Sequence, residues 1–237
     1  MKVKECREAL TAKADPDKVE HLKYFFKTGP GQYGEGDMFL GITVPANRQV
    51  VKMCTEFDLD DITLLLDDPY HEVRLLGGLL LERMYDKHKE RRDEVVDFYV
   101  KNLPKFNNWD LIDLTCYKIL GHYLIDQPDR KVLYDLARSE NMWEQRAAIV
   151  STMAFVRNRK NRELDDTYAI AEMLLDHTQD LMHKAVGWLL REAGKEDRAR
   201  LDAFLGRHYD RIPRTALRYA IEKHPEQERK AWLNRKF

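Results

Sequence analysis

Apolar residues recur along most of the chain at the spacing of amphipathic helices, three or four residues apart. Glycine and proline number only 11 and 8, and they gather at the breaks between the apolar segments. A half-buried strand would show single apolar and polar residues in alternation, and no convincing run of that kind is present. The pattern therefore predicts an all-α fold.

Several of the helical segments repeat along the sequence. Four of them share a register in which a charged residue stands at the same position: Arg74, Asp110, Arg146 and Lys184, spaced 36, 36 and 38 residues apart. A fifth segment begins at Ile212, and a second helical segment separates each one from the next. Helix pairs that recur at this length are typical of HEAT and armadillo repeats. The sequence predicts a single α-solenoid domain, residues 1–237, with a concave inner surface.

The stretch Gly29–Gly36 (GPGQYGEG) breaks the helical pattern with four glycines and one proline. It predicts an irregular loop over about residues 28–37. The apolar segment DMFLGITVP follows and ends at Pro45, and its pattern allows either a short helix or an extended connector. Helical spacing resumes near Asn47.

The composition is that of a globular protein, with 43% hydrophobic and 34% charged residues among 237. The net charge is −1, so nucleic-acid binding would have to rest on a local basic face. The three cysteines lack a CxxC spacing, so they predict neither a disulfide framework nor a thiolate metal site and favour a reducing cytoplasm. No signal-peptide pattern opens the sequence, and no apolar run approaches the roughly 20 residues of a membrane span.

Sequence motifs for cofactors and metals are missing. The chain contains no GxGxxG, P-loop, GxSxG or HExxH motif. Its eight histidines, His71 among them, have no ligand-like spacing, so we interpret them as ordinary surface or interior residues. We therefore expect no cofactor and no metal. We also expect the protein to be a monomer.

The helical segment around Trp188 carries a stripe of cations. At about 100° per residue, one face of this helix holds Lys184, Trp188, Arg191 and Lys195, and the opposite face holds aliphatic residues from Met182 to Ala193. One interpretation is a solvated face on which the indole packs against the stems of Lys and Arg. The other is contact with the phosphates and the bases or sugars of nucleic acid.

Further cations occur in neighbouring repeats. They are Arg146, Arg157, Arg214 and Arg218, together with the other cations of the run RNRKNR at residues 157–162. Taken alone, such a run is more often a solvated loop. Because a solenoid aligns equivalent positions of successive repeats, we expect these side chains to form one basic strip. Acidic residues on the second helices and outer loops would then offset the positive charge of this strip, so that the net charge of the chain stays near zero.

Residues 107–114 (NNWDLIDL) begin one of the repeated helices, and their asparagines suit an N-cap. Trp109 and Asp113 follow four residues apart, which places an indole and a carboxylate side by side on one helical face. From the repeat register we expect both to face the same concavity as Arg146 and Trp188. The alternative is that Trp109 anchors the start of the helix and that Asp113 is an acid favoured by the helix dipole.

Five segments together resemble the AlkD-type family of bacterial DNA alkylation-repair glycosylases, and the likeness extends over most of the chain. They are FLGITVP (39–45), NNWDLIDL (107–114), NMWEQRAAI (141–149), HKAVGWLLREAGK (183–195) and PRTALRYAIEK (213–223). The resemblance implies HEAT-like repeats with a concave DNA-binding groove. It also implies excision of cationic purines, such as 3-methyladenine and 7-methylguanine, from double-stranded DNA, without flipping the base into a protein cavity.

The resemblance also implies which residues act. It assigns the functional positions to Trp109, Asp113, Arg146 and Trp188, and Tyr24 stands where the family can carry an aromatic residue close to the DNA. The glycine-rich stretch departs from the pattern and resembles a variant branch. Some relatives bind DNA without excising bases, so both the lesion preference and the activity stay open at this point.

The implied substrate needs few chemical groups. A purine alkylated at N3 or N7 is already a cation and a good leaving group, so no acid has to protonate it. One carboxylate beneath the sugar stabilises the developing sugar cation and orients water, and Asp113 is the candidate. Trp109 and Trp188 would press against the deoxyribose, and Arg146 would hold a phosphate. We do not expect Asp110 to act together with Asp113.

Two other classes of function compete with a glycosylase. One is a non-catalytic HEAT-repeat protein that recognises distorted or branched DNA. The other is a HEAT-type scaffold for protein interactions, which would favour an apolar or acidic groove rather than a face of tryptophan and cations.

Overall fold

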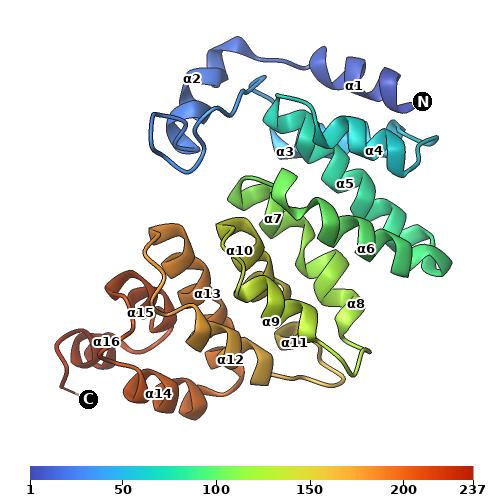
Figure 1. Ribbon diagram of the computed structural model, residues 1–237. Coiled ribbons are helices and arrows are strands. Elements are labelled where there is room, and N and C mark those ends of the chain that lie inside the picture. Colours follow the sequence, from blue (N-terminus) through green and yellow to red (C-terminus); the bar gives the residue numbers. More distant parts are fainter. Residues whose placement is uncertain (237) are drawn as a thin grey trace. The chain divides into compact units, whose positions relative to one another are not determined.

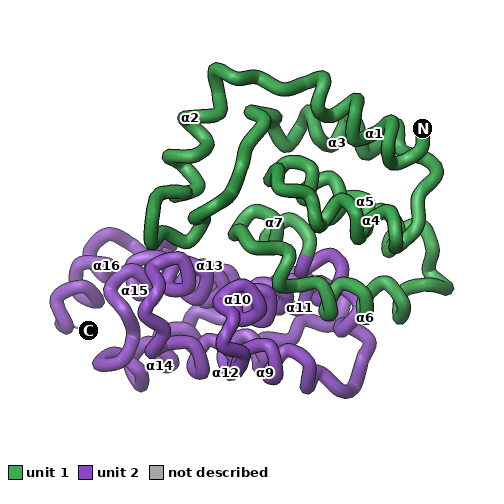
Figure 2. The backbone as a smooth tube through the Cα atoms, turned by 45° about the horizontal axis from the view of Figure 1, so that its top comes forward, with its two compact units in different colours: residues 1–115 green, residues 116–237 purple. Residues whose placement is uncertain are grey.

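The computed structural model describes residues 1–236, and these residues form helices joined by turns and connectors, without a β-sheet (Figure 1). The predicted all-α fold of helical repeats is confirmed. The chain divides into two compact units, Met1–Thr115 and the residues from Cys116 onward (Figure 2). That the whole chain forms a single domain with a concave groove stays a prediction.

The first unit is built around one long helix. Its helices are α1 (Val3–Thr11), α2 (Pro16–Phe25), α3 (Val44–Met53), α4 (Leu59–Leu66), α5 (His71–Lys87), α6 (Arg92–Asn102) and α7 (Trp109–Thr115), with 3₁₀ turns at Lys89–Arg91 and Leu103–Lys105. Helices α3, α4, α6 and α7 all pack against α5. Every residue of α5 from Leu75 to Leu81 is buried, so the apolar run LLGGLLL forms core, as its composition predicts.

The glycine-rich stretch forms consecutive turns, as predicted. Residues 37–43 of the segment DMFLGITVP form a non-helical connector, and its last two residues already belong to α3. Helix α3 begins at Val44, three residues before the predicted start near Asn47. The reason is local: Pro45 is compatible with the first helical turn, and the hydroxyl of Thr43 accepts a hydrogen bond from Ala46 N at 3.4 Å.

The second unit continues the helix pairs. It contains a π-helical turn (Tyr117–Gly121), α8 (His122–Leu124), α9 (Lys131–Ala137), α10 (Met142–Ser151), α11 (Met153–Arg157), α12 (Asp165–Met173), α13 (Asp180–Glu196), α14 (Arg198–Arg207), α15 (Arg214–Ala220) and α16 (Glu226–Leu233). Each repeated segment and each second segment of the predicted pairs is a helix. Packing of α9 against α10 and of α13 against α14 and α15 follows the predicted order.

The packing of α13 against α15 depends on one glycine. A Cβ on Gly187 would lie 2.4 Å from the carbonyl oxygen of Ala216, closer than any side-chain carbon can approach. The predicted aliphatic face of α13, which includes Met182, Leu189 and Ala193, is buried. The amphipathic pattern of this helix therefore identified its core-facing side correctly.

Candidate functional site

Trp109 and Asp113 line one cavity of the first unit. Trp109 is the first residue of α7, and Asp113 follows one turn later. Both side chains are partly exposed, and both border a cavity of about 340 Å³. Residues from α2, the connector, α3 and α5 provide its other walls. The structure therefore brings the indole and the carboxylate together at one concave surface within this unit.

Aromatic rings form the wall behind Trp109. Phe26 stacks on the indole with ring centroids 5.4 Å apart, and Phe25 meets it edge-on at 5.8 Å. Phe26 also stacks on Phe39 at 5.1 Å, and both of these rings lie 4.8 Å from the imidazole of His71. This chain of ring contacts restricts the orientation of Trp109, because turning the indole would break the contacts with both phenylalanines.

A buried network of charges lies beneath these rings. His71 bridges two carboxylates: its Nδ1 lies 3.1 Å from Asp37 Oδ2, and its Nε2 lies 2.9 Å from Asp110 Oδ2. The guanidinium of Arg74 donates to the other oxygen of Asp37. All four side chains are nearly inaccessible to solvent. Two cations and two anions balance, which is the condition under which buried charges are tolerated.

The network changes the protonation of its members. Burial lowers the pKa of His71, but the carboxylates of Asp110 and Asp37 outweigh it and raise the pKa from 6.5 to about 9. Burial raises the pKa of Asp37, but hydrogen bonds and charge from His71, Arg74 and Asn108 bring it below its ordinary value. At neutral pH His71 is therefore an imidazolium and Asp37 a carboxylate.

The network fixes the start of α7 on the rest of the unit. Asn108, which is fully buried, donates from Nδ2 to Asp37 Oδ2 at 3.0 Å and accepts from the backbone of Trp109 at 2.9 Å. Asp110 accepts from Leu111 N at 2.9 Å while it contacts His71. The residues on both sides of Trp109 are thus held by buried polar contacts, and the indole is positioned by the backbone as well as by its ring contacts.

Glu72 holds the connector in the same way. Its carboxylate accepts hydrogen bonds from the backbone amides of Leu40, Gly41 and Ile42 at 2.9 to 3.1 Å. A carboxylate that accepts from three backbone amides makes strong, charge-assisted contacts. Phe39, which forms part of the aromatic wall, is therefore anchored beside α5.

Asp110 and Asp113 are three residues apart, and both line the cavity. Asp110 is nevertheless engaged by His71 and is largely buried, whereas Asp113 is partly exposed. That these two acids do not act as a pair stays a prediction, which the different surroundings of the two carboxylates support. The reason is the contact with His71, since the helical spacing alone would place both acids on one face.

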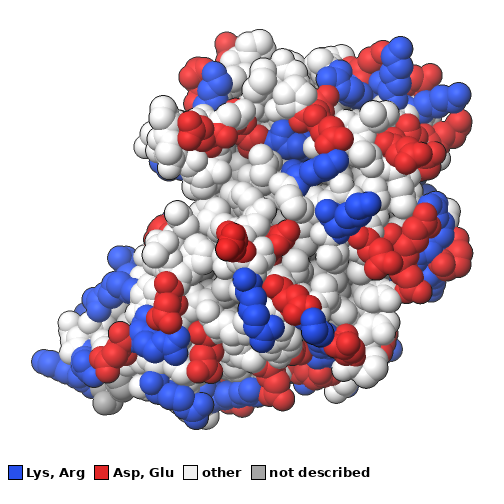
Figure 3. Space-filling view, in the orientation of Figure 1, with Lys and Arg blue, Asp and Glu red and all other residues white. Residues whose placement is uncertain are grey.

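The cations predicted around Trp188 are paired with acids. Lys184 Nζ lies 2.8 Å from Asp180, Lys195 Nζ lies 2.7 Å from Glu192, and Arg191 contacts Glu222. Asp180 and Glu192 belong to α13 itself, so part of the balancing negative charge lies on the same helix as the cations, in addition to the second helices and outer loops expected from the sequence. On the face drawn in Figure 3, blue and red side chains are likewise interspersed.

The remaining predicted DNA contacts differ in exposure. Arg157, Arg214 and Arg218 are exposed, and Tyr24 is 75% exposed with Lys27 Nζ 4.4 Å from its ring centre. Arg214 also donates to the carbonyl of Leu233, and Arg157 lies over the ring of Tyr117. Trp188 is half-buried on α13.

Arg146 is only 5% exposed, and its Nη1 donates to the carbonyl oxygen of Leu181 at 2.8 Å. This contact ties α10 to the start of α13. Arg146 therefore supports the packing of the second unit, and the phosphate contact expected from its register stays a prediction.

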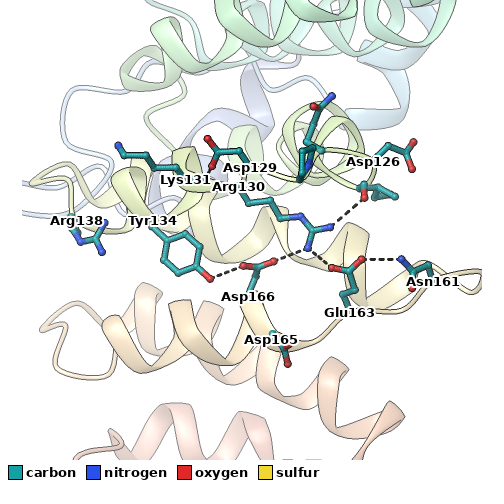
Figure 4. Close-up of a pocket in the computed structure, with 13 residues that line it drawn as sticks. Asp126, Asp129, Arg130, Lys131, Tyr134, Arg138, Asn161, Glu163, Asp165 and Asp166 are labelled. Carbon is teal, nitrogen blue, oxygen red and sulfur yellow. Dashed lines mark hydrogen bonds and ion pairs between the residues drawn. The ribbon is translucent and has the colours of Figure 1, made fainter.

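A larger cavity of about 1030 Å³ lies in the second unit beside Arg130 (Figure 4). Several of its polar groups pair with one another: Arg130 Nη1 lies 2.6 Å from Glu163 and 2.7 Å from Asp166, and Tyr134 donates to Asp166 at 2.6 Å. Burial and the Asp166 carboxylate raise the pKa of Tyr134 to about 12, so its hydroxyl is not poised as a base at neutral pH. This arrangement favours a structural role.

Sequence reasoning missed His71, Asp37 and Glu72. The histidines were tested only for metal-ligand spacing and were then interpreted as ordinary surface or interior residues, and no partners were assigned to the acids. A signal was available, because Arg74, Asp110 and Arg146 are charged residues at equivalent positions of the repeated helices. All three are buried, and a buried charge requires a partner.

Within residues 1–236, no helix combines the length and apolar character required to cross a membrane. The described part of the chain likewise contains no group of three His, Cys, Asp or Glu side chains arranged to hold a metal ion. The three cysteines are buried thiols, and burial together with Cys6 raises the pKa of Cys54 to about 12. The thiol of Cys54 is therefore not a nucleophile at neutral pH.

Paired helices around a cavity of aromatic and acidic residues define an α-helical repeat protein with a ligand-sized site. A family model described as DNA alkylation repair enzyme matches residues 6–224, so the chain belongs to the DNA alkylation repair enzyme family. A solved structure described as a predicted DNA alkylation repair enzyme from Enterococcus faecalis is similar in fold. Its TM-score is 0.69 at 16% identity, over 90% of this chain and 98% of that chain. A search of curated proteins gave no significant match.

Proposed function

We propose that this protein is a monofunctional DNA glycosylase that removes cationic N3- and N7-alkylated purines from double-stranded DNA. The observation that carries the proposal is the pairing of Trp109 and Asp113 at one apolar cavity, in a chain of the DNA alkylation repair enzyme family. An alkylated purine leaves without protonation, so the site needs one group that stabilises positive charge on the sugar. Asp113 is the group that we assign to this role.

The surroundings of Asp113 support this assignment. The cavity is lined mainly by aromatic and aliphatic side chains, which exclude water and weaken dielectric screening. A carboxylate acts more strongly on a developing sugar cation in such surroundings than in water. We further propose that the indole of Trp109 packs against the deoxyribose and offers its ring face to the same charge.

The reaction uses water rather than an amine as the nucleophile. The described lining of the cavity includes no lysine, so nothing in it supports a covalent Schiff-base intermediate. Asp113 is suited to orient the water and to accept its proton. This is why we propose base release without cleavage of the DNA strand.

We assign supporting roles to further residues named from the sequence, all of which lie in the second unit except Tyr24. Trp188 would contact a deoxyribose, and Arg146 would bind a phosphate. The DNA backbone contacts would come from Tyr24, Arg157, Lys184, Arg191, Lys195, Arg214 and Arg218. Because several of these cations have acidic partners, the DNA phosphates must displace those acids, which lowers the affinity. Counterions released from the DNA make the binding weaken as the salt concentration rises.

Release of free bases tests the proposal. The protein is incubated with duplex DNA treated with a methylating agent, and the supernatant is separated by chromatography. We expect 3-methyladenine and 7-methylguanine to appear faster than in the control without protein. If the protein binds this DNA and releases neither base, it is a DNA-binding protein without glycosylase activity. If it does not bind the DNA at all, the scaffold interpretation is favoured.

A further inference from the structure

Lys27, the residue that follows Phe26, has an unusual backbone conformation. Its φ is +56°, in the left-handed region that glycine adopts freely and that crowds the Cβ of other residues. Within residues 1–236, Arg235 is the only other non-glycine residue with a positive φ. Residues held in this way are concentrated at binding and catalytic sites. The chain therefore keeps a lysine at a position where a glycine would fold with less strain.

The turn that contains Lys27 is well braced. It ends α2 in a Schellman motif, in which Thr28 N donates to the carbonyl of Lys23 at 3.1 Å. In the same motif Lys27 N donates to the carbonyl of Tyr24 at 3.4 Å. Gly34 N, in the glycine-rich turns, donates to the carbonyl of Lys27 at 3.1 Å. These contacts fix the direction in which the side chain of Lys27 leaves the backbone.

The charge of Lys27 is not neutralised by a neighbouring acid. Each of the two lysines within α2 forms an ion pair with an acid three residues earlier, Asp15 or Glu20. In the described part of the chain Lys27 forms no such pair, and its Nζ lies 4.4 Å from the centre of the exposed ring of Tyr24. An ammonium over an aromatic face keeps its hydrogen-bond donors. Lys27 can therefore bind an anion without displacing an acid, unlike the paired cations of α13.

Lys27 stands at the edge of the site formed by Trp109 and Asp113. The ring of Phe26 stacks on Trp109 with the centroids 5.4 Å apart, and Phe26 lines the same cavity as Asp113. Consecutive Cα atoms are about 3.8 Å apart, so the side chain of Lys27 begins directly beside this aromatic wall.

The proposed reaction brings phosphates to this edge. A deoxyribose held against Trp109 and Asp113 has a backbone phosphate on each side. The carboxylate of Asp113 repels these phosphates, and the cations assigned to DNA from the sequence all lie in the second unit. A cation of the first unit beside the site would offset the repulsion.

We propose that the ammonium of Lys27 binds a backbone phosphate of the damaged strand, next to the nucleotide that reacts. The ring of Tyr24 supports the ammonium from the other side. The proposal rests on the proposed function and adds to it a DNA contact in the first unit. The contact involves only the DNA backbone, so no base has to leave the helical stack. The glycine-rich turns then serve as the brace that holds Lys27 in place.

Three substitutions separate the charge of Lys27 from its backbone strain. Lys27→Gln removes the charge and keeps the strain, Lys27→Arg keeps both, and Lys27→Gly removes both. The probe is a fluorescently labelled duplex with one tetrahydrofuran analogue of an abasic site, which the reaction cannot consume. Lys27→Gln and Lys27→Gly should bind it about tenfold more weakly, with a slope of log affinity against log salt lower by about 0.9.

Lys27→Arg should bind the same duplex within about twofold of the wild type, because it retains a cation that contacts phosphate. Wild-type affinity and slope in Lys27→Gln would overturn the proposal. An equal loss of affinity in Lys27→Arg and Lys27→Gln, or no binding by the wild-type protein, would overturn it as well.

Thermal unfolding distinguishes a DNA contact from a structural role. Lys27→Gly should unfold at a temperature no lower than the wild type, because glycine adopts a φ of +56° without crowding. Arg235→Gly is the matched control: Arg235 has φ +54°, but its guanidinium pairs with Asp210, so DNA binding should not change. A loss of stability in parallel with the loss of affinity, or the same loss of affinity in Arg235→Gly, would overturn the proposal.

Base release from methylated duplex DNA separates the two proposals. Lys27→Gln should need about tenfold more protein for half-maximal release of 7-methylguanine, with a limiting rate within about threefold of the wild type. If Lys27→Gln matches the wild type at every protein concentration, the phosphate contact falls and the glycosylase assignment stands. If Lys27→Gln weakens DNA binding but the wild-type protein releases no base, the contact with the DNA backbone stands and the glycosylase assignment falls.

Discussion

His71 Nε2 lies 2.9 Å from Asp110 Oδ2, and this contact joins the first turn of α5 to the first turn of α7. The other nitrogen of the ring contacts Asp37, so one imidazolium holds two carboxylates from different segments. Trp109 and Asp113 lie on either side of Asp110 in the same short helix. The buried charges of the first unit therefore determine where the proposed catalytic side chains stand.

The network predicts a loss of stability at alkaline pH. The pKa of His71 is raised from 6.5 to about 9 in the folded protein. A group whose pKa rises on folding stabilises fully below its unfolded value, so this contribution is complete below about pH 6.5 and disappears as the pH rises through about 9. At about 1.36 kcal/mol per pKa unit it amounts to roughly 3 kcal/mol. Chemical denaturation across this range measures it.

The variant His71→Gln is the control for that measurement. It should be less stable than the wild type at neutral pH, because it leaves Asp37 and Asp110 without their shared cation. Its free energy of unfolding should also change less between neutral pH and the alkaline limit. If the variant showed the same alkaline slope as the wild type, a group other than His71 would be responsible.

Asp113→Asn should lower the rate of base release by about 10²–10³, because it removes the charge that stabilises the sugar cation while keeping the shape of the side chain. The affinity for duplex DNA should stay nearly unchanged, since the proposed backbone contacts come from other residues. Asp86→Asn, at an exposed position of α5, is the matched control and should release bases at the wild-type rate. Full activity in Asp113→Asn would remove this carboxylate from the mechanism.

Gly41→Ala should disturb the aromatic wall. Gly41 has φ +83°, and a Cβ there would lie 2.0 Å from the carbonyl oxygen of Asp15, the residue before α2. Gly31→Ala is the matched control, because Gly31 has φ +71° but nothing within 4 Å of the added atom. Both variants should lose about 1–2 kcal/mol through the left-handed backbone.

The steric clash should add a further ~1–3 kcal/mol for Gly41→Ala alone. It should also slow base release, because the connector carries Phe39, and Asp15 immediately precedes α2, which ends at Phe25 and is followed by Phe26. Equal stabilities of the two alanine variants, measured by denaturation, would show that the connector moves freely enough to absorb the clash.

Arg146→Ala should reduce the salt dependence of DNA binding, lowering the slope of log affinity against log salt by about 0.9 for one lost phosphate contact. The same variant should unfold more easily, because it removes a buried side chain that donates to Leu181 O. Arg218→Ala, at an exposed position of α15, should reduce the slope without a loss of stability. An unchanged slope in Arg146→Ala would leave this residue a purely structural role.

The helices were predictable because their signal is local. On α13, the spacing of Met182, Leu189 and Ala193 along the sequence identifies the face that the structure buries. The turns after α2 follow from the glycines and the proline of residues 29–36 in the same way. The start of α3 was placed too late because the cap formed by Thr43 lies outside the apolar pattern.

The partners of the charged residues were not predictable by these means. Arg191 and Glu222 form an ion pair 31 residues apart, whereas Lys195 and Glu192 pair within one helix. Helical spacing predicts a pair within one helix, such as Lys195 and Glu192, but it does not predict which residues of different helices meet. The prediction of a basic strip was based on the positions of the cations alone. It therefore left out the acids that pair with those cations in the folded protein.

By itself the sequence determined the helices, their pairing into repeats and the placement of Trp109 and Asp113 on one helical face, because each of these depends on residues a few positions apart. Only the tertiary structure decided that Asp37, His71 and Asp110 meet in a buried network and that aromatic residues enclose a cavity beside Asp113. These contacts join residues 34 and 39 positions apart. Their geometry is set by how helices pack, which no local periodicity encodes.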